Sequence, residues 1–327
     1  MGKLSLNPLK TPILYVFCLL IIFPLVIKSG FALHVLTLIL LWSLLCISLN
    51  IIFGYAGQLS LAHGCLFGLG AYIYGVLAIK IGVNFWLAFP IAGLSSGLVG
   101  FLIGIPSLKL RGPYFVIVTL GFNIIIESLI ENWDSLTEGV NGLVGIPAPS
   151  NISCYFFTIN FDSKLAQYYL ILFFLLLFCV VMKMVKASLF GKSLIAIKGN
   201  EDLCQSVGLN TMSIKVQTFT LSSILAGLAG VLYASFVGVL VPYDASFHIG
   251  FDALVFLAVG GIGSTVGAII GPAIMVMLSE LLQALVEVRL LFNGLALILL
   301  IIFAPEGVAG IFSLLAAKLT KTATKIR

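Results

Sequence analysis

Long apolar runs, separated only by short polar or glycine-rich stretches, fill most of this sequence. Of its 327 residues, 61% are hydrophobic and 9% are charged, whereas about 25% of the residues in soluble domains are charged. A lipid bilayer solvates apolar runs of this kind, and about 20 apolar residues suffice for a helix to cross it. The sequence therefore predicts an all-α integral membrane protein whose residues 1–327 form a single polytopic transmembrane domain.

The apolar runs predict about ten transmembrane helices, some of them short and broken by glycine. The predicted spans are residues 13–27, 33–53, 60–79, 85–105, 114–130, 168–185, 216–237, 251–263, 266–285 and 290–303.

Lysine and arginine are distributed unequally between the connecting segments. With these spans, all but four of the 17 lysines and arginines fall on one side; the exceptions are Lys28, Lys80, Lys164 and Arg289. Positively charged segments tend to stay in the cytoplasm. We therefore expect both termini and the basic segment 183–215 to be cytoplasmic, and the long segment 131–165 to be an external loop. That loop is either a docking surface or a solvated connector.

The basic segment 183–215 carries the signals of a short helix over residues 201–207. Asn200 suits the N-cap, Glu201 and Asp202 suit the positive helix start, and Gly208 suits a left-handed C-cap. Such a helix either lies on anionic lipid or fits a groove in a cytoplasmic partner, and the pattern leaves both open. The candidate contact residues for a partner are Asn200, Glu201, Asp202, Leu203, Val207 and Gly208.

No motif in the sequence predicts catalysis, nucleotide binding or a cofactor. Gly191-Lys192-Ser193 matches the end of a P-loop, but Lys186 stands where the pattern requires its first glycine. The histidines are too scattered to predict a metal site. They are His34, His63 and His248. We expect neither a metal nor a nucleic-acid partner.

Two glycine-rich segments interrupt predicted spans, at residues 54–70 and 260–271. Non-helical backbone at membrane depth is tolerated where it is buried in protein or lines a cavity. The first segment also contains Gln58, Ser60 and His63, which we predict to line a solute pathway. Glycines at four-residue spacing elsewhere favour close helix packing.

A polar stripe follows one face of the span at 114–130. Thr119, Asn123 and Glu127 recur every four residues and so share a helical face. We predict that they line the same pathway. The alternatives are hydrogen bonding to a neighbouring helix, and for Glu127 a position at the membrane surface.

Several ordered motifs resemble those of permease subunits of bacterial ABC importers for branched-chain amino acids, and more closely those of the LivM-type subunit. They are GYAGQLSLAHG at 54–64, FGLGAY at 67–72, LRGPYF at 110–115, VTL at 118–120, NGL at 141–143, GKSL at 191–194, GGIGS at 260–264 and PEG at 305–307. The similarity extends from about residue 50 to residue 310.

The resemblance implies a multi-pass protein of the bacterial inner membrane that works with four partner components. These are a second permease subunit, two ATP-binding subunits and an external solute-binding protein. Segment 183–215 would then be the coupling loop that contacts an ATPase. Branched-chain amino acids are the expected solute, and urea, short amides or other amino acids are alternatives within the same importer class. A stand-alone secondary transporter and a non-transporting membrane scaffold are alternatives from other classes.

Overall fold

The computed structural model describes residues 20–21, 23–24, 29–154, 157–281 and 307–308. The predicted spans at 13–27 and 290–303 lie largely or wholly outside these residues, as do both termini.

Six helices of the described chain are long and apolar enough to cross a membrane, which confirms the all-α membrane fold. They are α2 with its π-helical extension η2 (Gly30–Asn50 and Ile51–Tyr55), α3 with η3 (His63–Val76 and Leu77–Ile81), α4 (Phe85–Ser107), α5 (Pro113–Asn132), α7 (Lys164–Ala187) and α10 (Thr211–Val237). Each overlaps one predicted span. Helix α3 begins three residues later than predicted, and helices α7 and α10 begin four and five residues earlier.

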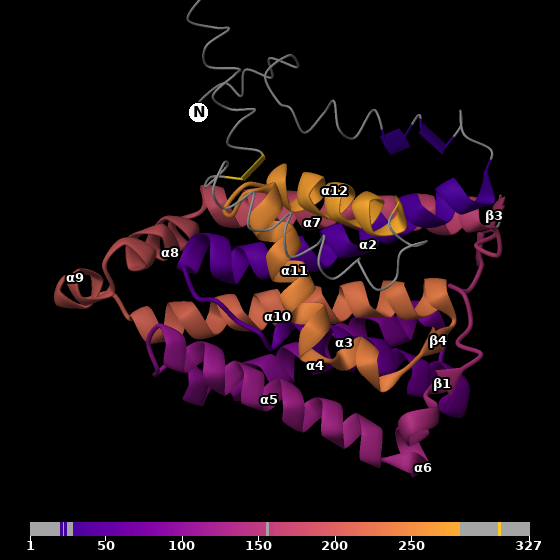
Figure 1. The fold of residues 1–327 in the computed structure, drawn as a ribbon, viewed down its shortest axis with the longest axis horizontal. Helices are drawn as coiled ribbons and strands as arrows, with labels where there is room; N and C mark the ends of the chain where they lie inside the picture. The colour runs from indigo at the N-terminus through magenta and orange to yellow at the C-terminus, as the bar shows by residue number, and fades with distance from the viewer. Residues whose placement is uncertain (1–19, 22, 25–28, 155–156, 282–306, 309–327) are drawn as a thin grey trace, which may run out of the picture.

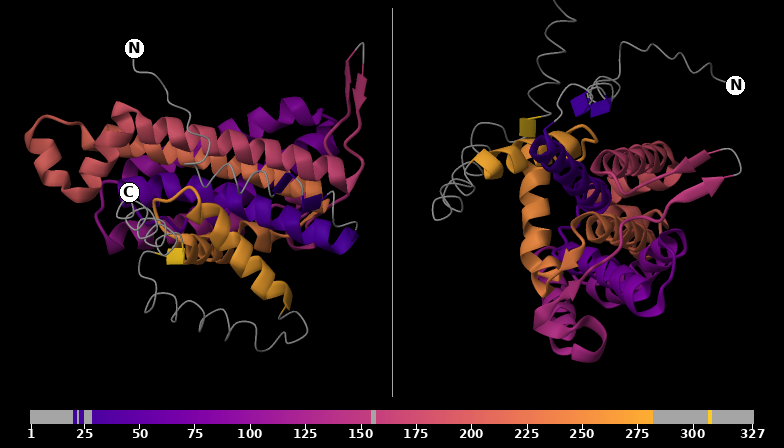
Figure 2. Two further views of the ribbon diagram at one scale, coloured as in Figure 1. Left: turned by 90° about the horizontal axis from the view of Figure 1, so that it is seen from above. Right: turned by 90° about the vertical axis from the view of Figure 1, so that its right-hand side faces the viewer.

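The prediction of about ten spans is not confirmed, because the next two helices are shorter. Helices α11 (Phe247–Gly260) and α12 (Gly267–Leu281) have 14 and 15 residues. At 1.5 Å per residue, α11 reaches about 21 Å, less than the roughly 30 Å of a hydrocarbon core. Helix α12 extends to Leu281, the last residue described in this part of the chain. Helix α11 also runs across the long helices instead of alongside them (Figures 1 and 2). The sequence pattern could not reveal this, because apolarity reports burial and not direction.

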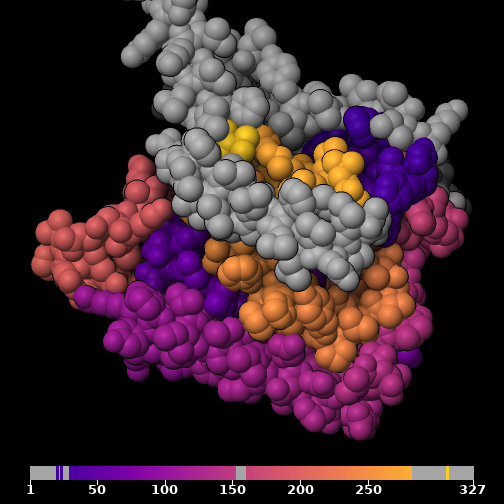
Figure 3. Space-filling model, in the orientation of Figure 1, coloured from indigo at the N-terminus to yellow at the C-terminus, as the bar shows by residue number. Residues whose placement is uncertain are grey.

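The two ends of the bundle differ. Helices α8 (Leu189–Gly199) and α9 (Glu201–Ser206) project from one end (Figures 1 and 3). The opposite end carries small elements within the predicted external loop and next to it. These are α6 (Asp134–Thr137), η4 (Gly139–Asn141), β1 (Leu143–Val144), β2 (Ile152–Cys154), β3 (Phe157–Ile159), β4 (Val239–Leu240) and η5 (Pro242–Ala245).

Two short antiparallel ladders organise that opposite end. Strand β1 pairs with β4, with Leu143 opposite Leu240, and so ties the loop after α5 to the end of α10. Strand β2 pairs with β3 as a local hairpin.

Helix α10 packs closely against α4 along a row of glycines. A Cβ atom added at Gly97 or Gly100 would lie 2.3 Å from the Ile224 side chain or 2.0 Å from the Ser223 hydroxyl, respectively. On the α3 side, a Cβ atom at Gly230 would lie 1.9 Å from the carbonyl oxygen of Phe67. The backbones can approach this closely only because these positions lack side chains, as predicted for glycines at such spacing.

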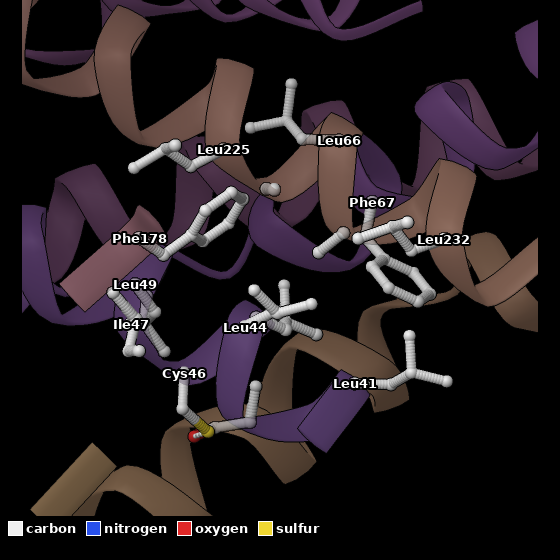
Figure 4. Packing of buried hydrophobic residues seen from close by; sticks show 14 of the residues in the cluster. Leu41, Leu44, Cys46, Ile47, Leu49, Leu66, Phe67, Phe178, Leu225 and Leu232 are labelled. Atoms are coloured by element: carbon white, nitrogen blue, oxygen red, sulfur yellow. Dashed lines mark hydrogen bonds between the residues drawn. The ribbon is translucent and has the colours of Figure 1, made fainter. Parts of the chain in front are cut away.

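The apolar core joins α2, α3, α7 and α10. Figure 4 shows leucine, isoleucine and phenylalanine side chains of these four helices meeting in one cluster. The labelled members are Leu41, Leu44, Cys46, Ile47, Leu49, Leu66, Phe67, Phe178, Leu225 and Leu232. This core holds the start of α3, and thus the polar residues described next, at a fixed depth in the bundle.

Candidate functional site

The polar stripe of α5 lies against the start of α3. The Thr119 hydroxyl oxygen accepts a hydrogen bond from the backbone N–H of Leu61 at 3.2 Å, and the Asn123 side-chain oxygen accepts one from Cys65 at 2.8 Å. The first backbone N–H groups of a helix have no partner within that helix. Both α5 side chains are fully buried, so the stripe supplies this helix start with acceptors inside the protein.

The same stripe also reaches the start of α11. The Asn123 side-chain amide donates to the carbonyl oxygen of Ala245 at 3.3 Å. One turn further along α5, the Glu127 carboxyl group lies near the backbone N–H of Phe247 and near His248. One helical face therefore holds two helix N-termini that are far apart in the sequence.

Ser60 and His63, predicted to line a pathway, lie at the same helix start and are fully buried. The Ser60 hydroxyl accepts from the Ala62 backbone N–H at 3.2 Å. The His63 Nε2 atom lies 2.6 Å from the Ser222 hydroxyl oxygen, and that hydroxyl donates its hydrogen to the Ser48 carbonyl oxygen. His63 Nε2 therefore carries the hydrogen and donates it to Ser222.

Gln58 lies apart from this buried group, beside a cavity. The cavity measures about 490 Å³ and lies between the segment before α3 and the start of α5. Its lining residues are Gly57, Gln58, Leu59, Gly112, Pro113, Val116 and Ile117. The structure thus brings Thr119, Asn123, Ser60 and His63 together, with Glu127 one turn beyond, and places Gln58 at a separate opening. Their role in solute passage stays a prediction.

The helix predicted from residue 201 is present as α9. The Asn200 side chain accepts a hydrogen bond from the Leu203 backbone N–H at 3.0 Å, and Gly208 adopts a φ of +87°. Leu203 and Val207 are 63% and 72% exposed. Two apolar side chains therefore face outward at the tip of the molecule.

Both acidic residues of α9 form ion pairs with basic residues of neighbouring segments. Glu201 forms an ion pair of 2.6 Å with Lys215, and Lys215 also donates to the Leu108 carbonyl oxygen at 3.2 Å. Asp202 forms an exposed ion pair of 2.7 Å with Arg111, and this hydrogen bond raises the pKa of Arg111 above its usual value. The first pair attaches α9 to α10, and the second attaches it to the connection between α4 and α5.

Sequence reasoning missed two polar residues that connect distant segments. The buried Asn50 of α2 accepts a hydrogen bond from the Gly263 backbone N–H at 2.7 Å and donates one to the Ser264 carbonyl oxygen at 3.0 Å. Lys198 of α8 donates to the Gly54 carbonyl oxygen at 2.9 Å. A lone asparagine at the end of an apolar run was the available signal for the first. For Lys198 there was none, because it is one of five lysines in the segment 183–215 and nothing in the sequence sets it apart from the others.

Within the described residues, no group of three or more histidine, cysteine, aspartate or glutamate side chains could hold a metal ion.

A bundle with six helices of membrane length is the fold of a multi-pass membrane protein. Residues 31–304 match the family described as "Branched-chain amino acid transport system / permease component". The chain belongs to this family. It is therefore a transport permease and not an enzyme.

Individual relatives give the same result. The chain is 31% identical to the high-affinity branched-chain amino acid transport system permease protein LivM of Salmonella typhimurium, over 90% of this chain and 74% of that protein. It is 32% identical to LivM of Escherichia coli K12, over 88% of this chain and 72% of that protein. It is 25% identical to LivH of Salmonella typhimurium, over 82% and 91%. No solved structure gave a significant match.

Proposed function

We propose that this chain is the LivM-type permease subunit of an ABC importer that carries branched-chain amino acids across the inner membrane of a bacterium. The family and the names of its relatives support the solute class. The sequence has no P-loop, so the energy for uphill transport comes from separate ATP-binding subunits.

The observation that carries the coupling role is the exposure of Leu203 and Val207 on α9. The acidic residues of this helix already form ion pairs within the chain. Exposed apolar side chains on a fixed helix are suited to a groove in a protein partner, whereas a helix that lies on anionic lipid contacts it through basic side chains. In α9 itself, residues Glu201–Ser206 include two acids and no lysine or arginine. The two ion pairs hold the helix in place, so movement of the partner is passed to the bundle.

The remaining partners follow from the same proposal. A second permease subunit of the LivH type completes the membrane portion, since relatives of both names match this chain. The two ATPase subunits bind at the end of the assembly that carries α8 and α9. An external solute-binding protein delivers the amino acid to the opposite end, which carries β1 and β4. In this proposal α9 and both termini are cytoplasmic, as the distribution of basic residues predicts.

Reconstitution of the assembled importer with its binding protein tests the proposal. The wild-type assembly should take up leucine and hydrolyse ATP faster when the loaded binding protein is present. Leu203→Asp should abolish the stimulated hydrolysis, because burying an unpaired carboxylate at the contact costs several kcal/mol. Leu203→Met, which keeps an apolar side chain of similar volume, should remain close to wild type.

Normal uptake by the Leu203→Asp variant would refute a protein partner at α9. Membrane insertion of each variant should be measured in parallel, so that loss of the subunit is not mistaken for loss of coupling.

A further inference from the structure

The two glycine-broken segments of this chain are bonded to one another through a single side chain. Asn50 holds the loop between α11 and α12 by its two hydrogen bonds to Gly263 and Ser264. A Cβ atom at Gly54 would lie 2.1 Å from the Asn50 side-chain oxygen and 2.9 Å from the Gly263 nitrogen. The π-helical end of α2 and the 261–264 loop therefore fit together only because residue 54 is glycine.

The same π-helical turn is also bonded to α8. The Lys198 ammonium group donates to the Gly54 carbonyl oxygen at 2.9 Å. The stem of Lys198 covers Gly57, where an added Cβ atom would lie 2.9 Å from the Lys198 Cγ atom and where φ is +69°. The turn thus contacts both the side chain of Lys198 and the 261–264 loop.

A π-helical turn is a suitable element for such a link. Single π-helical turns inside α-helices are rare and often occur at functional positions. The Gly54 carbonyl oxygen takes its hydrogen bond from Lys198, so a shift of α8 acts directly on the backbone of residues 51–55. Gly57 and Gln58, which line the 490 Å³ cavity, follow immediately.

We infer that Lys198 is a positioning residue for transport, which passes movement of the α8–α9 pair to both broken segments through Gly54 and Asn50. This inference rests on the proposed function, because it assumes that a conformational change of an ATPase partner causes that movement. Lys198 contacts no solute in this role. It sets the position of residues 54–58. The hydrogen bonds of Asn50 then couple the position of the 261–264 loop to that of the turn.

The first test uses the purified full-length chain and needs no transport. Lys198→Met removes the donor but keeps much of the apolar stem over Gly57. Amide hydrogen exchange in residues 51–58 and 261–264 should rise about tenfold, the size expected when one hydrogen bond to a charged group is lost. Lys192→Met is the matched control, since Lys192 is exposed on the same helix, and it should leave exchange in both segments unchanged.

The second test measures leucine taken up per ATP hydrolysed by the assembled importer in proteoliposomes. Lys198→Met and Lys198→Gln should keep ATP hydrolysis but lower this ratio about tenfold, for the same physical reason. Lys198→Arg keeps a cationic donor and should restore most of the ratio, and Lys192→Met should match wild type.

The outcomes separate the two proposals. If Lys198→Met leaves exchange in the 261–264 loop unchanged, or if it transports with the wild-type ratio, the link does not exist and the inference is wrong. Equal loss in Lys198→Arg and Lys198→Met would also overturn it, because the ammonium donor would then be irrelevant. Absence of ATP-driven leucine uptake by the wild-type assembly would refute the proposed function instead, while the exchange experiment would still decide whether the link is present.

Discussion

Lys215 and Glu201 form an ion pair of 2.6 Å in which the lysine side chain is only 3% exposed. The neighbouring pair of Arg111 and Asp202 is of similar length, 2.7 Å, but its side chains are 58% and 72% exposed. The first pair joins α9 to α10, and the second joins it to the connection between α4 and α5. Because water screens the exposed pair and not the buried one, the attachment of α9 depends mainly on Lys215.

Replacing Lys215 should therefore cost far more stability than replacing Arg111. In Lys215→Met, the Leu108 carbonyl oxygen loses its donor, and the Glu201 carboxylate loses its cationic partner and keeps only the hydrogen bond from the Thr211 hydroxyl. Removing one member of a buried pair costs about 3 to 5 kcal/mol. Arg111→Met should cost little stability, because its pair with Asp202 is exposed and screened by water. Thermal unfolding of the purified chain in detergent measures the difference.

The double variant Glu201→Gln/Lys215→Met provides the control. Removing the unpaired charge should recover part of the stability lost in Lys215→Met. Equal destabilisation by Lys215→Met and Arg111→Met would contradict the prediction that the buried pair contributes more to stability than the exposed pair.

Close packing of α3 against α10 makes a second prediction. Gly230→Ala places a methyl group against the Phe67 carbonyl oxygen, where a Cβ atom would lie 1.9 Å away, so the helices must separate. Gly121→Ala is a matched change on α5, where nothing lies within 4 Å of the added atom. We expect Gly230→Ala to lower the unfolding temperature and the amount of inserted protein. Gly121→Ala should be neutral or stabilising by up to about 1 kcal/mol, since alanine favours helix. Similar unfolding temperatures for the two variants would mean that the α3–α10 contact is looser than described.

The sequence predicted the elements whose causes are local. The cap at Asn200, the left-handed Gly208 and the shared face of Thr119 and Asn123 all follow from side-chain chemistry at fixed spacing. The lengths of the six long helices follow from the thickness of the apolar phase that they must match.

What the sequence could not predict depends on contacts between distant segments. Nothing near Asn50 indicates that it binds Gly263, because the two are 213 residues apart. The crossing direction of α11 and the attachment of Lys215 to Leu108 are likewise set by tertiary packing. The polar stripe of α5 was recognised, but its hydrogen bonds to the starts of α3 and α11 became evident only in the structure.

The unequal distribution of basic residues predicts orientation, which labelling can test. Ser206 on α9 and Asn141 beside β1 are both exposed and lie at opposite ends of the bundle (Figure 1). In intact cells, an impermeant thiol reagent should label Asn141→Cys, and it should label Ser206→Cys only after the membrane is opened. The chain without an added cysteine gives the background. Labelling of Ser206→Cys in intact cells would invert the predicted topology.

Asn123 distinguishes a pathway wall from helix packing. Asn123→Leu leaves the Cys65 N–H and the Ala245 carbonyl oxygen without their partner, and each buried unsatisfied group costs about 1 to 3 kcal/mol. Asn132→Leu is the control at the end of the same helix, because Asn132 is exposed and bonds only within α5, to Ser128. We expect Asn123→Leu to unfold at a lower temperature and to transport leucine more slowly, and Asn132→Leu to differ little from wild type.

Stability alone does not separate the two roles, so the decisive measurement is chemical access. If the N-termini of α3 and α11 move apart during transport, residue 123 becomes exposed to water in at least one nucleotide state. Asn123→Cys should then react with an impermeant thiol reagent. Reaction only in the ATP-bound or only in the nucleotide-free assembly would identify the stripe as part of the pathway. A cysteine that stays unreactive in every state, together with a normal transport rate per folded molecule for Asn123→Leu, would mean that the stripe serves packing. The solute would then pass elsewhere, and the cavity beside Gln58 would be the next surface to probe.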